Sequence, residues 1–548
     1  MRVRRLGRVS YGEAWDLQKA LQRESDEEYL LLLEHPDVYT RGRHADPANT
    51  RDLGVDATMV DVDRAGDVTF HGPGQLVGYP IVNVGTGPHR GPEHVRRVEQ
   101  VVIDALVALG LDADDVGRLP GCPGVWVGLA GVDPAPRKIA AVGVRVARGR
   151  TMHGFGLNVT TDLAGFSRIV PCGISRHPVT SLEAEGWSVP IDEVASAVEA
   201  AAVRQWGPVE SHQAVTPAGV DAPAGAGGTT SALQRRLRRA GVDEAVDISG
   251  RKPAWMKVPV RMGEEFRELR SSLARADLVT VCEEAGCPNI YECWSAGTAT
   301  FMINGSRCTR ACGFCLIDTS RPLPLDPGEP ARVADAVARL GLAHAVVTCV
   351  ARDDLPDGGA AAFAATIRAI RDRSAHTVVE VLISDLKGER SSLDLVLEAR
   401  PDVVNHNIET SARLQRAVRP SASYARSLVV LARAKDGGFT TKSGIIVGMG
   451  EGKAEVLATM EDLRAVGVDI ITIGQYLRPT DRHVPVARWW APEEFDELAA
   501  AGEAMGFAHV QASPLTRSSY HAREAADEAR PAPLPAWVPV TLGSKVLP

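Results

Sequence analysis

The sequence predicts a mixed α/β protein of two domains, an α+β domain followed by a partial barrel of six βα units. Its 548 residues, 45% of them apolar, provide enough material for two or more ordinary domain cores. The composition changes sharply at residues 215–230, a run of small residues with Pro and Gly that is typical of a flexible linker. Beyond it, predicted strands and helices alternate, which favours a parallel sheet with right-handed crossovers.

These observations divide the chain into four predicted segments. We expect a first domain over residues 1–210, a flexible linker over 211–250, a second domain over 251–523 and a Pro-rich tail over 524–548. A basic patch at 233–239 falls within the linker, and its spacing is compatible with a short helix.

In the first domain, apolar periodicity predicts two helices and six strands that form a mostly antiparallel sheet. The run Tyr29–Leu33 is continuously apolar, which indicates a short buried strand. The helices are expected over residues 11–23 and 93–109, and the strands over 29–33, 60–64, 76–82, 125–128, 138–146 and 152–159.

In the second domain, six strands alternate with helices, and six units rather than eight favour an open barrel. The first strand is followed directly by a cysteine-rich loop, at the edge where βα barrels hold their active sites. The strands are expected over residues 300–303, 345–350, 378–383, 403–408, 443–447 and 470–476, and the helices over 331–340, 361–373, 393–398, 425–434 and 456–466.

Charge and hydropathy exclude several classes of function. The net charge of −8 gives no indication of a surface that binds nucleic acid or an anionic membrane. No run of about 18 apolar residues occurs, so no membrane span is predicted. The basic start at residues 1–8 is not followed by the apolar region of a secretory signal. We therefore expect a cytoplasmic protein with reduced thiols and with neither nucleic-acid nor membrane partners.

Six of the nine cysteines form two closely spaced triplets. Trios of thiols on short loops suit iron–sulfur ligation, in which three cysteines on a four-iron cube leave one iron free for chemistry. Structural zinc and buried, inert thiols are the alternatives. Zinc prefers paired CxxC knuckles or Cys/His sets of four, and no His lies at ligand spacing. The spacing therefore favours iron–sulfur clusters. The triplets are Cys282, Cys287 and Cys293, and the CxxxCxxC set Cys308, Cys312 and Cys315.

The CxxxCxxC triplet resembles that of radical S-adenosylmethionine (SAM) enzymes, and the two triplets together resemble lipoyl synthase. The likeness covers about residues 250–523 and implies a partial barrel of the radical SAM type. Supporting runs are DDLPDGG at 353–359, NHNIET at 405–410, TKSG at 441–444, GQY at 474–476 and RSSYH at 517–521.

That resemblance implies two 4Fe–4S clusters. Cys308, Cys312 and Cys315 would hold the one that binds SAM. Cys282, Cys287, Cys293 and Ser519 would hold an auxiliary cluster that supplies sulfur. One electron from a low-potential donor, such as ferredoxin or flavodoxin, would cleave SAM. The resulting radical would abstract hydrogen from C6 and C8 of an octanoyl chain, where sulfur is inserted.

Taken alone, the residues of the first domain are weaker candidates. The loop His71–Gly74 is either a turn or a functional loop, and a single His there is more often structural. Cys172 lies between Pro171 and Gly173, a setting that can expose a thiol, although a lone Cys is more often a small buried hydrophobe. Lys138 opens a predicted strand, an unusual place for an ammonium group unless it faces solvent or a site.

Together these residues resemble lipoyl(octanoyl) transferase, through the runs DRAGDVTFHGPGQL at 63–76, KIAAVG at 138–143, HGFGLN at 153–158 and PCGI at 171–174. The resemblance implies the fold of biotin and lipoate ligases. It also implies that Cys172 carries the acyl group and that Lys138 lowers the pKa of that thiol. The implied acyl channel consists of Arg64, Ala65, Gly66, Asp67, Val68, Thr69, Phe70, His71, Ala141, Val142, Gly143, Gly154, Phe155 and Gly156.

The implied reaction moves octanoyl from acyl carrier protein to Cys172 and then to a lysine of a lipoyl domain. Such domains belong to 2-oxoacid dehydrogenase complexes and to the glycine cleavage H protein. Because a thioester becomes an amide, no ATP is needed. The product of the first half is the substrate of the second, so the chain is predicted to be bifunctional in lipoate biosynthesis. The rivals are an ATP-dependent lipoate ligase for the first half and a zinc-held binding module for the second.

The sequence departs from the two families at a few positions. Ala65 and Phe70 stand where Gly and Tyr are expected, and Cys349 and Ala351 stand where Ser and a polar residue are expected. Cys349 lies in an apolar strand and is interpreted as an inert core thiol.

Overall fold

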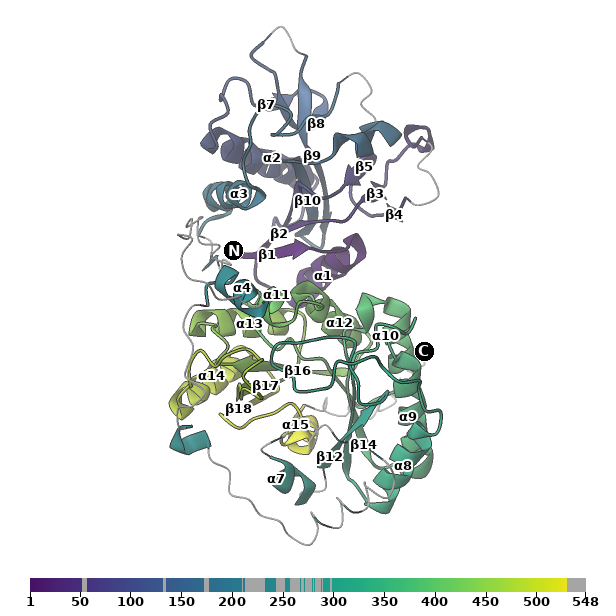
Figure 1. The fold of residues 1–548 in the computed structure, drawn as a ribbon. Helices are drawn as coiled ribbons and strands as arrows, with labels where there is room; N and C mark the ends of the chain where they lie inside the picture. Colours follow the sequence, from purple (N-terminus) through teal and green to yellow (C-terminus); the bar gives the residue numbers. More distant parts are fainter. Residues whose placement is uncertain are drawn as a thin grey trace, which may run out of the picture.

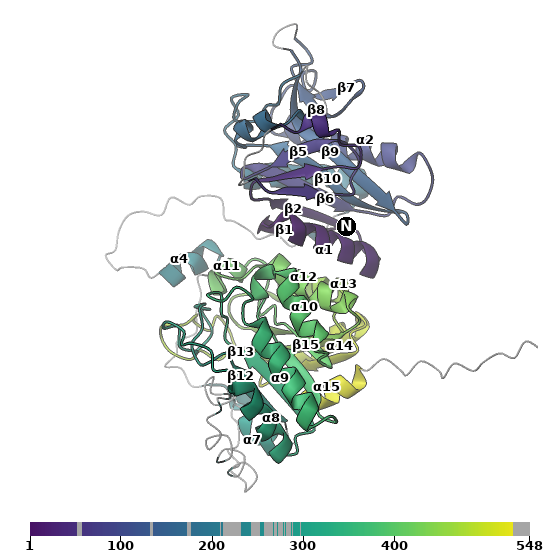
Figure 2. The ribbon, with the colours of Figure 1, turned by 90° about the vertical axis from the view of Figure 1, so that its right-hand side faces the viewer.

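The computed structural model describes residues 1–51, 57–131, 135–171, 177–208, 210–211, 232–242, 252–256, 289–295 and 298–529, and the single residues 267, 271, 278, 280 and 287. Two α/β units, one from each half of the chain, lie against each other (Figures 1 and 2). Within the described residues, no helix has both the length and the apolar character needed to cross a bilayer.

The first unit is built on an eight-stranded sheet with the order β11-β1-β2-β6-β10-β9-β8-β7. Its β1/β2 and β1/β11 pairs are parallel and its other five pairs are antiparallel, so the prediction of a mostly antiparallel sheet is confirmed. The strands are β1 (Arg2–Arg8), β2 (Tyr29–Glu34), β6 (Gln75–Ile81), β7 (Gly117–Leu119), β8 (Cys122–Val127), β9 (Arg137–Ala147), β10 (Arg150–Asn158) and β11 (Glu210–Ser211).

Helices cover both faces of this sheet, which explains the continuous apolar run of β2. Tyr29, Leu31 and Leu33 pack in the cluster that contains α1, whereas Leu30 and Leu32 pack in the cluster that contains α2 and α3. A strand with both faces buried carries no polar alternation. The helices are α1 (Tyr11–Glu24), α2 (Arg90–Ala108) and α3 (Ile191–Trp206); a smaller sheet of order β4-β3-β5 comprises β3 (Val38–Arg41), β4 (Met59–Asp61) and β5 (Val68–His71).

The second unit is a parallel sheet of seven strands in sequence order, β12 to β18. All six predicted strands are present, and β18 is an additional seventh. Its residues, His509–Ala512, are short and partly polar, and all four are half-buried, so they give no clear strand pattern. The strands are β12 (Thr298–Ile303), β13 (His344–Cys349), β14 (Val378–Leu382), β15 (Val403–Asn405), β16 (Thr440–Val447), β17 (Ile470–Gln475) and β18.

The edge strands β12 and β18 are not paired with each other within the described part of the chain, so the sheet is an open, partial barrel as predicted. Helices follow the strands and cover its outer face (Figure 2). They are α8 (Glu329–Arg339), α9 (Ala360–Arg373), α10 (Arg390–Glu398), α11 (Gln415–Val418), α12 (Tyr424–Asp436), α13 (Lys453–Ala465) and α14 (Pro492–Ala504), with α7 (Ile290–Ser295) before the barrel and α15 (Ala522–Glu528) after it.

Helix α1 joins the two units. It lies between the sheet of the first unit and helices α12 and α13 of the second (Figure 2). Leu17 and Leu21 of α1 belong to the same buried apolar cluster as Leu428 and Leu431 of α12. The two units therefore share a continuous core across their boundary.

Part of the predicted linker is ordered. The basic patch forms α4 (Ala232–Arg239), and Leu237 of this helix is buried with Leu414 and Val418 of the second unit. This part of the predicted 211–250 linker is therefore a packed helix rather than a flexible chain. Residues 212–231 and 530–548, which hold the Pro/Gly-rich run and the Pro-rich part of the predicted tail, lie outside the described residues.

Candidate active sites

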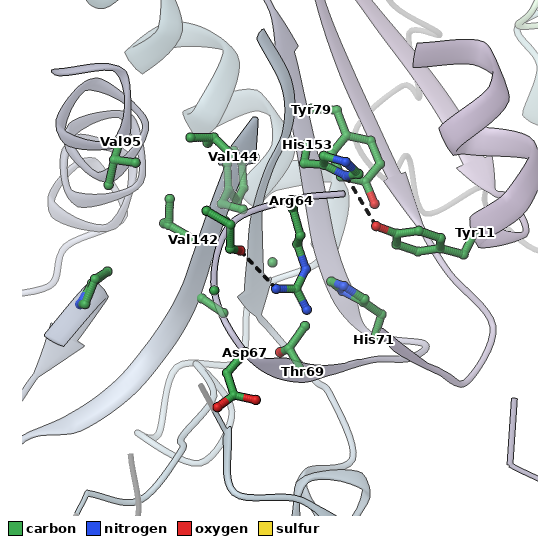
Figure 3. Close-up of a pocket in the computed structure, with 18 residues that line it drawn as sticks. Tyr11, Arg64, Asp67, Thr69, His71, Tyr79, Val95, Val142, Val144 and His153 are labelled. Atoms are coloured by element: carbon green, nitrogen blue, oxygen red, sulfur yellow. Dashed lines mark hydrogen bonds between the residues drawn. The ribbon is translucent and has the colours of Figure 1, made fainter. Parts of the chain in front are cut away.

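A cavity of about 210 Å³ opens in the first unit between β9, β10 and the loop that leads into β5. Figure 3 shows Arg64 from the loop before β5, Thr69 and His71 from β5, and His153 from β10, all directed toward it. Twelve of the fourteen predicted channel residues line it. The lining consists of Tyr11, Arg64, Ala65, Gly66, Asp67, Thr69, His71, Tyr79, Val95, Pro123, Ala141, Val142, Gly143, Val144, His153, Gly154, Phe155 and Gly156.

Val68 and Phe70 are the two predicted channel residues that do not line the cavity. Successive side chains of a strand point to opposite faces, so on β5 Thr69 and His71 face the cavity while Val68 and Phe70 face away. Val68 and Phe70 pack instead in a separate apolar cluster with Tyr39. The channel assignment therefore does not hold for these two side chains.

Two histidines of the cavity wall are held by polar neighbours. His153 Nε2 lies 2.7 Å from Asp63 Oδ1, its Nδ1 lies 3.3 Å from the Tyr11 hydroxyl, and His71 Nδ1 lies 2.6 Å from Gln75 Oε1. Burial lowers the pKa of His71 to about 3 and that of His153 to about 3. Both imidazoles are therefore neutral near pH 7, which suits an uncharged acyl chain.

Glycines in the cavity wall allow close approach of the backbone. A Cβ on Gly154 would lie 2.1 Å from the Gly78 carbonyl oxygen, and one on Gly143 would lie 3.1 Å from that of Ala65. Glycine is needed at these two positions because a neighbouring strand or the 64–67 loop approaches the backbone closely. The missing side chains also leave room for a ligand in the cavity.

Lys138 is buried next to an aromatic ring. Its side chain is 4% exposed, and its Nζ lies 5.0 Å from the centroid of the Trp126 ring. Nζ has no hydrogen-bond partner within the described residues. A buried ammonium group without an anion is costly, so this geometry suits a negatively charged neighbour.

The chain segment that follows Cys172 runs beside Lys138. The Lys138 N–H donates to the Pro178 carbonyl at 2.9 Å, and the Thr180 N–H donates to the Lys138 carbonyl at 2.9 Å. Cys172 itself lies outside the described residues, which stop at Pro171 and resume at His177.

The second candidate site is the loop that carries Cys308, Cys312 and Cys315, directly after β12. Its backbone is hydrogen-bonded to the loop that follows β13 and to the end of helix α11. The Thr309 N–H donates to the Ala351 carbonyl at 2.9 Å, and the Gly313 N–H donates to the Val418 carbonyl at 2.8 Å. The three thiols are half-buried. The predicted position of this loop at the carboxyl edge of the barrel is confirmed.

Arg310 anchors the loop between two of its cysteines. Nε and Nη2 donate to the Asp353 carboxylate at 2.7 Å each, and Nη2 also donates to Asp385 Oδ1 at 2.6 Å. Burial alone would lower the pKa of Arg310, but these carboxylates outweigh burial and raise it, so the guanidinium is charged.

The surroundings of the three cysteines suit thiolates bound to a metal cluster better than they suit free thiols. Burial raises the pKa of Cys312 and raises that of Cys315 to about 12, so without a metal both are protonated near pH 7. Within the described residues, no three His, Cys, Asp or Glu side chains lie close enough to share one metal ion.

Polar atoms without partners lie at the same edge of the barrel. Asn407 Oδ1, the Tyr476 hydroxyl and Arg419 Nε are buried and have no hydrogen-bond partner in the described part of the chain. Asn407 follows β15 and Tyr476 follows β17. An amphiphilic, charged ligand such as SAM fits these unmet groups.

Two of the upstream cysteines, Cys287 and Cys293, lie near the segment that holds Ser519. Asn289 Nδ2 donates to the Leu515 carbonyl at 2.7 Å, and the Tyr520 hydroxyl lies 3.2 Å from the Glu292 carboxylate. Cys287 and Cys293 are both half-buried in this region, and Cys282 lies outside the described residues. Burial raises the pKa of Cys287 and raises that of Cys349 to about 12, which agrees with the interpretation of Cys349 as an inert thiol.

Fold and sites together define a lipoate ligase or transferase catalytic domain joined to a radical SAM domain. The lipoyl protein ligase A/B catalytic domain family matches residues 10–203, and the radical SAM superfamily matches residues 302–463. The lipoyl synthase of Rubrobacter xylanophilus is 57% identical over 281 residues, which is 51% of this chain and 88% of that protein. The lipoyl synthase of Mycobacterium tuberculosis is 52% identical over 302 residues, which is 55% of this chain and 97% of that protein.

The chain belongs to the lipoyl synthase family. With its N-terminal catalytic domain it is a bifunctional protein of lipoate biosynthesis, and radical SAM membership implies 4Fe–4S and SAM chemistry. A solved structure of the bipartite lipoate protein ligase of Thermoplasma acidophilum aligns at 18% identity over 39% of this chain and 85% of that chain, with a TM-score of 0.32.

Proposed function

We propose that the first domain is an octanoyltransferase in which Cys172 carries the acyl group and Lys138 stabilises its thiolate. The observation that carries this proposal is the buried Lys138 Nζ, which has no anionic partner within the described residues. A nearby ammonium group lowers the pKa of a thiol, and the thiolate is the nucleophile.

The reaction has two balanced steps. The Cys172 thiolate attacks the thioester carbonyl of octanoyl-acyl carrier protein, and the carrier leaves as a thiolate that takes up a proton. The neutral amine of a lipoyl-domain lysine then attacks octanoyl-Cys172, so that the Cys172 thiolate leaves and the amine loses one proton. The lining of neutral imidazoles and glycines supports a channel for an uncharged chain.

A test of this reaction must separate it from ATP-dependent ligation. Octanoyl-acyl carrier protein, a lipoyl domain and the full chain are incubated without ATP, and mass spectrometry follows a gain of one octanoyl group. Cys172→Ala should abolish transfer. Lys138→Met should lower it by at least a hundredfold and shift its pH profile to higher pH. Transfer that requires ATP and survives Cys172→Ala would favour the ligase.

For the second domain we propose two 4Fe–4S clusters, one held by Cys308, Cys312 and Cys315 and the other by Cys282, Cys287, Cys293 and Ser519. When bound, the first cluster with SAM would supply the radical chemistry needed at C6 and C8 of the octanoyl chain, and the auxiliary cluster would supply sulfur. The chain itself orients the first loop through Arg310 and lays Asn289 and Glu292 against the segment that holds Ser519.

Iron analysis tests the cluster count. Anaerobically reconstituted protein should contain about eight irons per chain, and a Cys308/Cys312/Cys315→Ala triple variant should contain about four. A count of about four in the unaltered chain would contradict two clusters. The proposed partners are acyl carrier protein, a lipoyl domain and a low-potential electron donor such as ferredoxin or flavodoxin.

A further inference from the structure

Two acidic residues of α1 form ion pairs with two arginines of α12 across the boundary between the domains. Glu13 Oε1 accepts a hydrogen bond from Arg426 Nε at 2.5 Å, and Asp16 Oδ2 accepts one from Arg433 Nη2 at 2.7 Å. The partners of the first pair are 413 residues apart in the chain, so only the packing of the two domains brings them together.

The first of these pairs is connected, through Asp385, to the loop that carries Cys308, Cys312 and Cys315 (the cluster loop). Arg426 Nη1 lies 3.5 Å from Asp385 Oδ2, and that oxygen accepts no hydrogen bond from any residue that the structure describes. The other oxygen of Asp385 accepts the 2.6 Å hydrogen bond from Arg310, which stands between Cys308 and Cys312. Asp385 thus lies between two guanidinium groups and is bonded to one of them.

The position of Arg426 depends on Glu13. The side chain of Asp385 is fully buried, and those of Glu13 and Arg310 are only 7% and 6% exposed, so solvent screens these charges weakly. Glu13 and Asp385 are the two acids within ion-pair distance of Arg426 among the described residues. If Glu13 lost its charge, Arg426 would move toward Asp385 and compete with Arg310 for that carboxylate.

We propose that Glu13 of the transferase domain is a positioning residue for the cluster-binding loop of the other domain. By holding Arg426 beyond hydrogen-bond distance from Asp385, it leaves that carboxylate to Arg310. The transferase domain thereby contributes to the geometry of the radical SAM site without touching it. This inference rests on the proposed ligation by Cys308, Cys312 and Cys315.

Gly388 supports the proposal because it leaves room for the ion pair. A Cβ at this position would lie 2.6 Å from Glu13 Oε1 and 3.0 Å from Arg426 Nε, and Gly388 has a φ of +79°. Gly388 is the last residue of the short helical turn Leu386–Gly388 that Asp385 caps, so the same turn carries Asp385 and leaves room for Glu13. Glu13 Oε2 is held by the backbone N–H of Ser10, at the start of its own helix.

The experiment uses the full chain with Glu13→Gln, because Gln retains the shape of Glu and its role at the helix start. Asp16→Asn is the matched control. It breaks an ion pair of the same kind on the same two helices. Its partner Arg433 donates to the Gly388 carbonyl at 2.8 Å and, among the described residues, forms no ion pair with Asp353 or Asp385, the two acids that hold Arg310.

The first readout needs no metal. In metal-free protein, mass spectrometry measures the alkylation rates of Cys308, Cys312 and Cys315 with iodoacetamide. Glu13→Gln should raise these rates at least threefold, Asp16→Asn should leave them unchanged, and circular dichroism should show both variants folded. Glu13→Asp keeps the negative charge but places it one methylene farther from Arg426, so it should give an intermediate alkylation rate. This variant replaces Glu13→Gln if Glu13→Gln does not fold.

A double variant separates positioning from a loosened interface. Glu13→Gln with Arg426→Gln removes the competing cation as well, so the alkylation rates should return toward those of the unaltered chain. Rates that stay as high as in Glu13→Gln, or equal rates in Glu13→Gln and Asp16→Asn, would overturn the proposal.

A second readout uses reconstituted protein. The electron paramagnetic resonance signal of the reduced cluster should change less on addition of SAM in Glu13→Gln than in Asp16→Asn. If the chain binds no cluster but the alkylation rates follow the expected order, the proposed ligation fails while the positioning of the loop stands. If a cluster forms and the alkylation rates do not change, the positioning role fails while the ligation stands.

Discussion

Arg4 in the first strand of the chain is paired with Asp462 on α13 of the second domain, 458 residues later. Its Nε lies 2.8 Å from both carboxylate oxygens, and the side chains are 5% and 4% exposed. Tyr424 of α12 also donates to this carboxylate, at 3.0 Å. The two domains are therefore joined by a buried charge pair as well as by the apolar surface of α1.

We expect Asp462→Asn to destabilise the chain strongly. The substitution removes the carboxylate bonded to the buried Arg4 guanidinium and, among the described residues, leaves only Glu461, 3.7 Å from Arg4 Nη2, as a counter-charge. Removing one partner of a buried ion pair typically costs about 3–5 kcal/mol in the free energy of unfolding. Urea denaturation followed by circular dichroism measures this change. Glu93→Gln, which breaks the exposed Arg90–Glu93 pair of α2, is the control and should change the free energy by less than about 1 kcal/mol. Equal effects of the two substitutions would contradict a structural role for the Arg4–Asp462 pair.

Neighbouring residues of β5 should have separate roles. Phe70 packs against the Phe166 ring with 5.4 Å between centroids, so Phe70→Ala should cost about 3–5 kcal/mol of stability and leave acyl-chain preference unchanged. Thr69→Leu puts additional carbon atoms into the cavity and should shift the preference from octanoyl toward shorter chains by about tenfold. Transfer assays with acyl carriers of different chain length measure this shift. A change of chain preference in Phe70→Ala would contradict the assignment of facing directions.

His153 should make the first domain sensitive to acid. Burial lowers its pKa to about 3, against about 6.5 in an unfolded chain. Between these values the unfolded state binds a proton that the folded state does not, so stability falls as the pH falls, by up to about 1.4 kcal/mol per pH unit. Asn tolerates the backbone φ of +60° at this position. His153→Asn should therefore show a smaller loss of stability between pH 7 and pH 5, measured by urea denaturation. An unchanged pH dependence would show that His153 titrates normally.

Much of the barrel could be predicted from the sequence because its strands are apolar and separated by helices of ordinary length. β1 gives no such signal. It carries Arg2, Arg4, Arg5 and Arg8, whose charges are matched by acids that the fold brings from distant elements, such as Glu199 for Arg5 and Asp462 for Arg4. Ion pairs between distant segments cannot be predicted from a local sequence pattern. A strand whose arginines are paired inside the fold therefore has a sequence like that of a surface segment.

The acyl site was predictable in part. The sequence runs that resemble lipoyl(octanoyl) transferase contain the loop and the two strands that form the cavity wall. Because successive side chains of a strand alternate between faces, the position of Val68 and Phe70 on β5 would have excluded them from that wall. Tyr11, Tyr79 and His153 reach the cavity from α1, β6 and β10, and their proximity is a result of sheet order. Likewise, Glu13 and Asp16 look like solvent-facing acids of an amphipathic helix until α12 is placed beside them.

The interior of the barrel contains a buried ion pair that carries the last prediction. Lys442 Nζ lies 3.1 Å from Glu380 Oε1, both side chains are fully buried, and Asn405 also donates to this carboxylate, at 2.8 Å. Burial alone would raise the pKa of Glu380, but Lys442 and the hydrogen bonds outweigh burial and lower it to about 2. The pair therefore stabilises the fold above about pH 4.5, and this contribution is lost as the pH falls toward 2.

Lys442→Met should invert that dependence. Without the ammonium group, burial dominates and the pKa of Glu380 rises above its value in the unfolded chain, so the carboxyl group stabilises the fold only when it is protonated. The variant should lose about 3–5 kcal/mol at pH 8 and less at pH 5, measured by urea denaturation at both values. Lys442→Met with Glu380→Gln removes the buried charge, so it should recover most of the stability at pH 8 and lose the pH dependence. Equal losses in the single and double variants would mean that the lost packing of the lysine stem, rather than the unpaired carboxylate, causes the destabilisation.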